Sequence, residues 1–278
     1  MDGTAATLEL KLLPGARALL QAHARELPQR DDLCGAFCGA LALSAARIEQ
    51  HGDDPADQDA VALAAGTIVS RIPDISVLPR GERGRRDYRI VPPFVEDASV
   101  SGTNCAGVLR GIEHVSGGQL AAIPYSGPWS AQALDALFDV LAALARPATL
   151  IANVATRHLW GSAPPVDAVL AYLLEGADAE PAPDWDVGHF VCVFARTRGA
   201  GGALYGVADT YGSLGRGGVH VQPRERLARA LERPEMAPGG MIAVVAREDS
   251  DHVRTAVAPS GLVEGAWDNG TASAEAVM

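Results

Sequence analysis

The sequence predicts an α+β fold in which an N-terminal helical part packs on a C-terminal antiparallel β-sheet. Segments with helical apolar spacing dominate the first half of the chain, and short apolar or alternating segments dominate the second half. Two of the later segments are joined by the glycine-rich turn "TRGAGG", which is typical of a β-hairpin. The chain has 278 residues, of which 48% are hydrophobic, so it can bury a substantial core.

Helices are predicted from apolar periodicity and capping residues. The first predicted helix has helical spacing and stops before Pro28. Asp54 is expected to cap the third helix, with Pro55 in its first turn, and Ser130 is expected to cap the fifth. In chain order, the predicted helices are residues 15–27, 34–50, 55–65, 105–114, 130–145, 165–176 and 224–232.

Strands are predicted from short apolar runs that are bounded by glycine, proline or polar residues. The predicted strands at residues 187–196 and 203–212 form the predicted hairpin. Side chains alternate between the two faces of a strand, so His189 and Phe190 are expected to point to opposite sides of the sheet. In chain order, the predicted strands are residues 119–125, 148–154, 187–196, 203–212, 218–223 and 240–246.

One domain is expected over residues 1–263, with irregular insertions at about 66–100 and 155–186. The first insertion is rich in Pro, Gly and Arg and shows little periodicity ("LPRGERGRRDYRIVPPFVED"). The second contains the acidic, proline-rich stretch "ADAEPAPDWD". Residues 264–278 are polar and are expected to form a flexible C-terminal tail.

The net charge of −11 and a pI near 5.0 argue against nucleic acid and anionic membranes as partners. The chain has no apolar run of membrane-spanning length, and its first residues do not resemble a secretory signal, so we expect a cytoplasmic protein with reduced cysteines. Cys34 and Cys38 have C-x-x-x-C spacing, which matches zinc sites poorly. We therefore expect neither a metal nor a cofactor. The oligomeric state stays open.

Cys34 stands where a loop becomes a helix, and it is the first candidate for a functional residue. It could be a small residue in a buried helix, or a nucleophile at a helix N-terminus. A helix N-terminus favours the negative charge of a thiolate, whereas the neighbouring Asp31 and Asp32 disfavour it. A nucleophile at this position therefore needs a base. Cys38, one helical turn later, is the alternative nucleophile.

His189 is the best candidate for that base, because it stands among apolar residues in a predicted strand. A buried imidazole needs an acceptor for its ring N–H. The hairpin partner strand ends in "GVADTYG", which places Asp209 within reach of the ring. Cys34, His189 and Asp209 are therefore predicted to act as nucleophile, base and orienting carboxylate.

These stretches resemble the papain-like cysteine peptidases, and most closely the branch that cleaves double-glycine leader peptides from bacteriocins. That branch has a glutamine, a short gap and a D-C-G-x-A motif that opens a helix. Here Gln29 is followed by Asp32 and "CGAFCGALALSAARIEQHG", and the later family signature corresponds to "GHFVCVF" and "VAD". The resemblance implies a papain-like fold, with the nucleophile helix packed on the antiparallel sheet. It also implies that Gln29 is the oxyanion-hole donor beside the triad.

The sequence differs from the family pattern at three of these positions. Gln29 lies five residues before Cys34 instead of six, Leu33 replaces the aspartate before the cysteine, and Thr210 replaces the proline after Asp209. The separation of Cys34 and His189 along the sequence is also much longer than in leader peptidases. These differences keep open the alternative of a non-catalytic module that binds peptides on the same scaffold.

The predicted function is that of a stand-alone cysteine peptidase-like enzyme that cleaves a peptide or amide bond through an acyl-enzyme. Its substrate would be a peptide or natural-product precursor, or an acyl-carrier thioester if the acyl group passes to an amine instead of water. His158, Trp160 and Cys38 are predicted to contact the substrate. The other histidines are expected at the surface or at helix ends; they are His23, His51, His114, His220 and His252.

Overall fold

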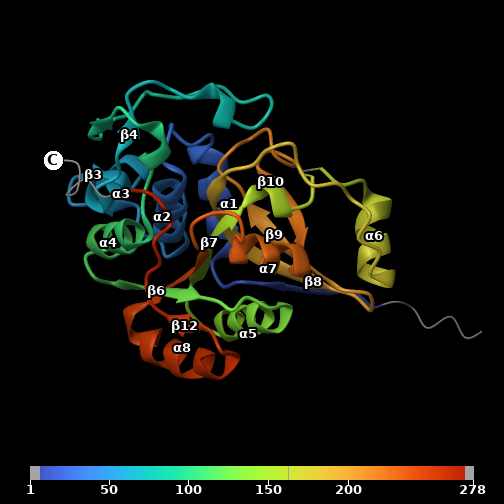
Figure 1. Cartoon of the computed structure of the whole chain (residues 1–278). Helices are drawn as coiled ribbons and strands as arrows, with labels where there is room; N and C mark the ends of the chain where they lie inside the picture. Colours follow the sequence, from blue (N-terminus) through green and yellow to red (C-terminus); the bar gives the residue numbers. More distant parts are fainter. Residues whose placement is uncertain (1–6, 162, 273–278) are drawn as a thin grey trace, which may run out of the picture.

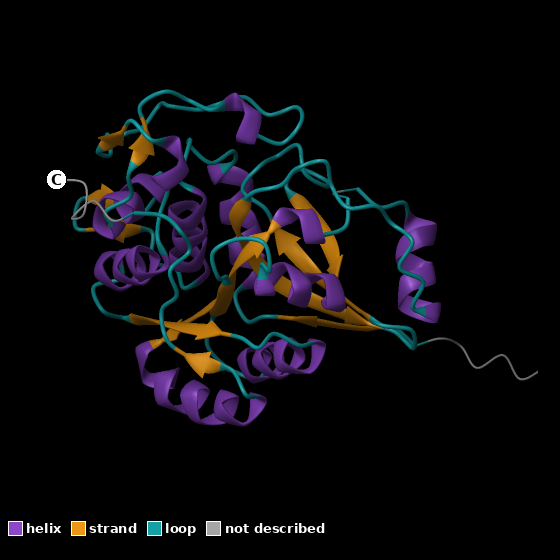
Figure 2. Ribbon diagram, viewed as in Figure 1, coloured by secondary structure: helices purple, strands orange, loops and turns teal. Residues whose placement is uncertain are grey.

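An eight-stranded antiparallel sheet forms the centre of the structure (Figures 1 and 2). The structure is a computed structural model, and it describes residues 7–161 and 163–272. The strands of this sheet are β1 (Glu9–Leu12), β6 (Leu120–Ser126), β7 (Ala148–Ala155), β8 (Gly188–Arg198), β9 (Ala203–Ala208), β10 (Val219–Pro223), β11 (Gly240–Ala246) and β12 (Val263–Glu264). The strand order is β10-β9-β8-β7-β11-β6-β12, and β1 pairs with the second half of β8. β8 and β9 form the predicted hairpin. The predicted combination of helices with an antiparallel sheet is therefore confirmed.

Helices cover both faces of this sheet (Figure 1). The helices on one face are α1 (Ala16–Glu26), α2 (Cys34–Ala45), α3 (Gln58–Ala65) and α4 (Cys105–Val115). The helices on the other face are α5 (Ala131–Ala142), α7 (Arg224–Glu232) and α8 (Ser250–Val257). A further helix, α6 (Val166–Glu175), packs beside Trp160 and Leu204.

β8 lies between the two layers of helices and contributes to both halves of the core. Phe190 and Cys192 pack in the cluster that contains α2, whereas Val191 and Val193 pack in the cluster that contains α5. This alternation follows from the pleat of a strand and matches the prediction for residues 190–193, whereas His189 and Phe190 both line the pocket described below. Because the strand is buried on both faces, it holds His189 at a defined position near its start.

α2 is a buried helix made mostly of small and apolar residues. All of its residues except Cys34 and Ser44 are buried, so it has no polar face. A Cβ atom added at Gly39 would lie 2.8 Å from Cγ1 of Val61, which shows how closely α3 approaches. The alanine and glycine content of α2 therefore allows tight packing between the sheet and the neighbouring helices.

The predicted ends of α2 and α3 require correction. α2 ends at Ala45 and not at Gln50, because the following residues turn into a short hairpin of β2 (Gln50–His51) and β3 (Asp54–Pro55). α3 begins at Gln58, and the residue that caps it is Asp57 and not Asp54. The cap at Asp57 is physically equivalent to the predicted one, since a carboxylate accepts from a free N–H of the first turn.

The first predicted insertion is an irregular segment, with a short parallel pair formed by β4 (Val69–Ser70) and β5 (Phe94–Val95). It is fastened to the loop that precedes α2. The backbone N–H of Arg85 donates to Oδ1 of Asp31 at 2.8 Å, and the Tyr88 hydroxyl donates to the carbonyl of Asp31 at 3.1 Å. The Ser70 N–H donates to Oδ2 of Asp32 at 2.7 Å. The insertion therefore covers the residues next to Cys34.

The C-terminal residues that the structure describes pack on the body, contrary to the predicted flexible tail. Trp267 is buried, and the Gly265 N–H donates to the carbonyl of Pro124 at 3.0 Å. The Asn269 side chain accepts from the N–H of Cys105, the first residue of α4. The buried Trp267 indole and the hydrogen bond of Asn269 to the start of α4 hold this segment on the body, although its sequence is mostly polar. The remainder of the predicted tail, 273–278, lies outside the described residues.

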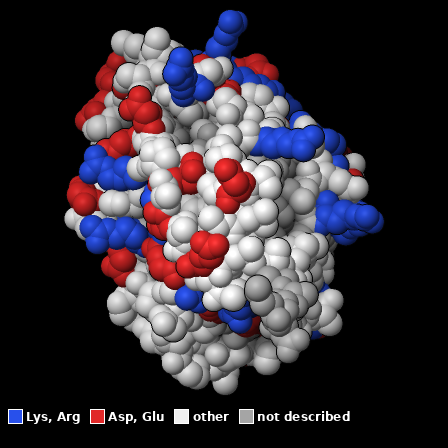
Figure 3. Space-filling model, turned by 90° about the vertical axis from the view of Figure 1, so that its right-hand side faces the viewer, with Lys and Arg blue, Asp and Glu red and all other residues white. Residues whose placement is uncertain are grey.

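Charged side chains are dispersed over the face that carries α6. Figure 3 shows Lys and Arg side chains there singly or in small groups, with acidic residues and broad uncharged areas between them.

Among the helices of residues 7–161 and 163–272, none combines the length and the apolar character that crossing a membrane requires.

Candidate active site

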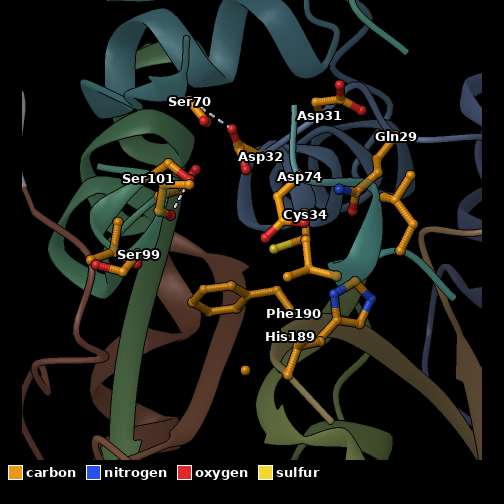
Figure 4. A pocket seen from close by; sticks show the side chains of 18 of the residues that line it. Gln29, Asp31, Asp32, Cys34, Ser70, Asp74, Ser99, Ser101, His189 and Phe190 are labelled. Carbon is orange, nitrogen blue, oxygen red and sulfur yellow. Dashed lines mark hydrogen bonds between the residues drawn. The ribbon is translucent and has the colours of Figure 1, made fainter. Parts of the chain in front are cut away.

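A pocket of about 380 Å³ opens at the N-terminus of α2 (Figure 4). Figure 4 shows Cys34 between two walls. One wall carries Asp31 and Asp32, from the loop before α2, and the other carries His189 and Phe190, from the start of β8. Residues of the insertion, among them Ser70 and Asp74, also line the pocket. The structure therefore brings together residues that lie more than half the chain apart.

Cys34 is the first residue of α2 and is only half buried, so its thiol is accessible from the pocket. The first N–H groups of a helix have no partner within the helix, and they present partial positive charge at this end. The residue before it, Leu33, offers no side-chain cap, so no side chain competes for that end of the helix. The thiol therefore lies at the end of the helix where backbone N–H groups have no partner within the helix.

His189 and Asp209 form a buried pair. Nε2 of His189 lies 3.0 Å from Oδ1 of Asp209, and both residues are at most 3% exposed. Asp209 follows directly after β9, next to β8, so the hairpin sets this distance. Asp209 therefore contacts the His189 ring, as the sequence predicts.

Thr210 defines which ring nitrogen of His189 carries a proton. Its hydroxyl donates to Oε1 of Gln29 and lies 3.2 Å from Nε2 of His189. With its proton directed to Gln29, the hydroxyl can only accept from the ring, as Asp209 does. Nε2 is then the protonated nitrogen, and Nδ1 is left for Cys34, with which the ring also interacts. Thr210 thus has a defined role where the papain-like pattern has proline.

Burial alone would lower the pKa of His189, but the charge of Asp209 and the hydrogen bond to it outweigh burial. Together with the Cys34 thiol they raise the pKa of His189 to about 10. Burial would raise the pKa of Asp209, but the charges and hydrogen bonds of His189 and His220 hold it well below its usual range. The geometry thus favours an imidazolium that is ion-paired with Asp209 at neutral pH.

Two further histidines contact Asp209, and both were expected at the surface or at helix ends. Nε2 of His220 lies 3.1 Å from Oδ2 of Asp209, and Nε2 of His23 donates to the Asp209 carbonyl at 2.6 Å. Both are buried, and burial is the main cause that lowers the pKa of His23. Neither residue is at the surface, although His23 does lie in the last turn of α1. The signals were present: His23 lies on the apolar face of α1, and His220 alternates with apolar residues in β10.

Aromatic rings enclose the imidazole of His189. The Trp185 ring lies 4.9 Å from it in an edge-to-face arrangement, and the Tyr211 ring stacks on it at 5.8 Å. The Trp185 indole also donates to the carbonyl of Val77 at 2.8 Å, which joins this side of the pocket to the insertion. These rings limit the access of water to the buried pair. Sequence reasoning did not identify either aromatic residue as part of the site.

Gln29 lines the pocket, as the oxyanion-hole prediction requires, but its amide is already engaged. Nε2 donates to the Tyr211 hydroxyl at 3.0 Å, and Oε1 accepts from Thr210. An amide nitrogen carries two protons, so one of them remains for a substrate oxygen. The contacts also tie the loop before α2 to the segment after β9.

The three residues that were predicted to contact substrate do not line this pocket. Cys38 is fully buried one turn into α2, and burial raises the pKa of its thiol well above the ordinary value. Trp160 is buried against Tyr172. His158 lies 2.9 Å from Glu235. Helical geometry explains the case of Cys38, because a residue four positions after Cys34 lies one turn deeper in the protein.

Several acidic residues face the pocket near Cys34. Burial raises the pKa values of Asp31 and Asp32, and Oδ2 of Asp31 is buried without a hydrogen-bond partner. Within residues 7–161 and 163–272, no group of His, Cys, Asp and Glu side chains is arranged to hold a metal ion. All four cysteines are unpaired.

Comparison with known proteins adds a family but no chemistry. Residues 13–268 match a family model described as "Family of unknown function (DUF6885)". No curated protein matches the chain.

Proposed function

The chain belongs to the family of unknown function DUF6885, and we propose that it is a cysteine-dependent acyl-transfer enzyme of papain-like type. One observation carries the proposal. The imidazole of His189 lies between the Asp209 carboxylate and the Cys34 thiol at the N-terminus of a helix, inside a pocket. A thiol, an imidazole and a carboxylate in this order can form and protect a nucleophilic thiolate.

The reaction begins when the Cys34 thiolate attacks the carbonyl carbon of a peptide or amide. The backbone N–H of Cys34 and the second N–H of Gln29 Nε2 stabilise the negative oxygen. The His189 imidazolium gives its proton to the leaving nitrogen, the C–N bond breaks and a thioester remains. Water, deprotonated by His189, then attacks the thioester and restores the thiol. If an amine replaces water in this step, the same site performs acyl transfer.

Alkylation kinetics test this proposal. At pH 6, iodoacetamide should label Cys34 at least about tenfold faster than the buried Cys105 and Cys192, because only a thiolate reacts. Mass mapping of the labelled peptides identifies the reacting residue. His189→Ala should abolish the fast reaction, whereas the control His252→Ala, at an exposed position, should not change it. Slow and equal labelling of all four thiols would contradict the enzyme and favour a peptide-binding module.

A further inference from the structure

Arg233 is a buried cation in the wall of the active-site pocket. It is 4% exposed, it lines the pocket, and it directly follows α7. No carboxylate among the described residues forms an ion pair with it; burial lowers its pKa, and a charge on Cys34 would counteract this effect. A buried cation without an anionic partner is costly. The protein therefore maintains a positive charge that its own acidic residues do not neutralise.

The contacts of the Arg233 guanidinium leave donors free. One Nη donates to Oδ1 of Asn153, and the other lies 3.2 Å from the sulfur of Met236. Nε is buried and has no partner. A guanidinium has five N–H donors and binds carboxylates through a planar fork, so these neutral contacts use only part of its capacity.

The surrounding backbone makes room for this side chain. Arg233 has a φ of 47°, a left-handed conformation that is uncommon for residues other than glycine. A Cβ atom at Gly188 would lie 2.5 Å from Nη2 of Arg233, and one at Gly239 would lie 2.5 Å from its Cδ. A strained backbone and two glycines thus accommodate the arginine, which suggests a function for it.

Arg233 lies on the imidazole side of the pocket. Its guanidinium contacts Gly188, the neighbour of His189, and Asn153 also lies within 3.5 Å of the His189 carbonyl. The imidazolium protonates the leaving nitrogen, so the leaving group must be bound on this side. Asp31 and Asp32 belong to the other wall (Figure 4), where they would repel a carboxylate.

We propose that Arg233 binds the carboxylate of the leaving group, so that the substrate is an N-acyl amino acid or a peptide cleaved at its C-terminal residue. This inference rests on the proposed function. In the reaction, the C–N bond to the terminal amino acid breaks, its nitrogen takes the proton of His189, and the acyl group forms a thioester with Cys34. Water then releases the acyl group as a carboxylic acid. In the transfer reaction the same arginine binds the carboxylate of an accepting amino acid.

Binding to the catalytically inactive full chain tests this inference without chemistry. N-benzoylglycine and N-benzoylglycinamide differ only in a carboxylate and a carboxamide, and calorimetry with Cys34→Ala measures the affinity for each. The acid should bind about tenfold or more tightly than the amide, because a charge-assisted hydrogen bond is lost in the amide. Equal affinities, or tighter binding of the amide, would overturn the inference.

Two double variants locate the carboxylate. In Cys34→Ala/Arg233→Gln the preference for the acid should disappear, whereas Cys34→Ala/Arg229→Gln should keep it. Arg229 is the matched control, since it lies in α7, is exposed and loses the same charge. A preference that survives Arg233→Gln would overturn the assignment. If Arg233→Gln does not fold, the acid–amide comparison in Cys34→Ala decides alone. Preference for the acid combined with slow iodoacetamide labelling would support the carboxylate site and reject only the proposed chemistry.

Discussion

Nε2 of His189 lies 3.0 Å from Oδ1 of Asp209, and the pair is enclosed by protein on almost every side. In this environment the carboxylate has little water to compensate its charge, so the imidazolium is its main counter-ion. The ring is held with Nε2 toward Asp209, and this leaves the other nitrogen for Cys34. The reactivity of the thiol and the stability of the fold should therefore both depend on one ion pair.

Removal of the carboxylate by Asp209→Ala should affect both properties. Breaking a buried ion pair on one side typically costs about 3 kcal/mol of unfolding free energy, because the partner is left uncompensated. Labelling of Cys34 by iodoacetamide at pH 6 should fall toward the rate of an ordinary thiol. Urea unfolding and labelling kinetics measure the two effects. Asp74→Ala, at an exposed acid of the same pocket, is the control; equal behaviour of the two variants would reject the role of Asp209.

The stability of the fold should depend on pH through His189. Its pKa is raised to about 10 in the folded state, so the ion pair stabilises fully below the unfolded pKa of about 6.5. This contribution is lost as the pH rises from there toward 10. The unfolding free energy should therefore fall by on the order of 3 kcal/mol more in the wild type than in His189→Ala over this range. His252→Ala should follow the wild type; parallel curves for His189→Ala would contradict the ion pair.

His220 should act as a positioning residue for Asp209. Nε2 of Gln222 donates to Nδ1 of His220 at 3.0 Å, so the ring must present its Nε2 proton to Asp209. His220→Leu leaves buried polar groups unpaired at a cost of about 1–3 kcal/mol, whereas His220→Gln can still donate.

A pH profile separates this role of His220 from a purely structural one. The hydrogen bond from His220 is one cause of the lowered pKa of Asp209, so its loss should raise that pKa. The pH below which the labelling rate of Cys34 falls should then be higher in His220→Leu than in the wild type. His220→Gln should restore the wild-type value. If this pH is unchanged in both variants, His220 contributes only to packing.

Gly35, the residue after the nucleophile, should not tolerate a methyl group. A Cβ atom there would lie 2.9 Å from Cγ2 of Val108 and 3.3 Å from the Phe190 ring. Gly35→Ala should therefore cost about 1–3 kcal/mol of unfolding free energy and slow the labelling of Cys34, because α2 must shift. Gly265→Ala is the matched control, since a Cβ atom there would meet nothing within 4 Å. Thermal unfolding that is equal for both variants would contradict this packing.

The elements that were predicted well have strong local patterns. The predicted helix 224–232 and strand 240–246 have the same bounds in the structure. The hairpin at residues 50–55 was missed because helix-compatible residues continue past Ala45, and a turn with tertiary contacts overrides them. β1 and α8 were not predicted, since one is a short exposed edge strand and the other a mostly polar helix.

The sequence by itself determined the fold class, the buried strands and the residue types of the candidate triad, because periodicity and capping are local properties. It placed Asp209 within reach of the His189 ring, because a hairpin is a short-range structure. Only the tertiary structure decided which histidines surround Asp209 and that Arg233 lies in the pocket wall without a carboxylate partner among the described residues. These positions depend on contacts between residues far apart in the chain, and the energy of a buried charge depends on all its neighbours together.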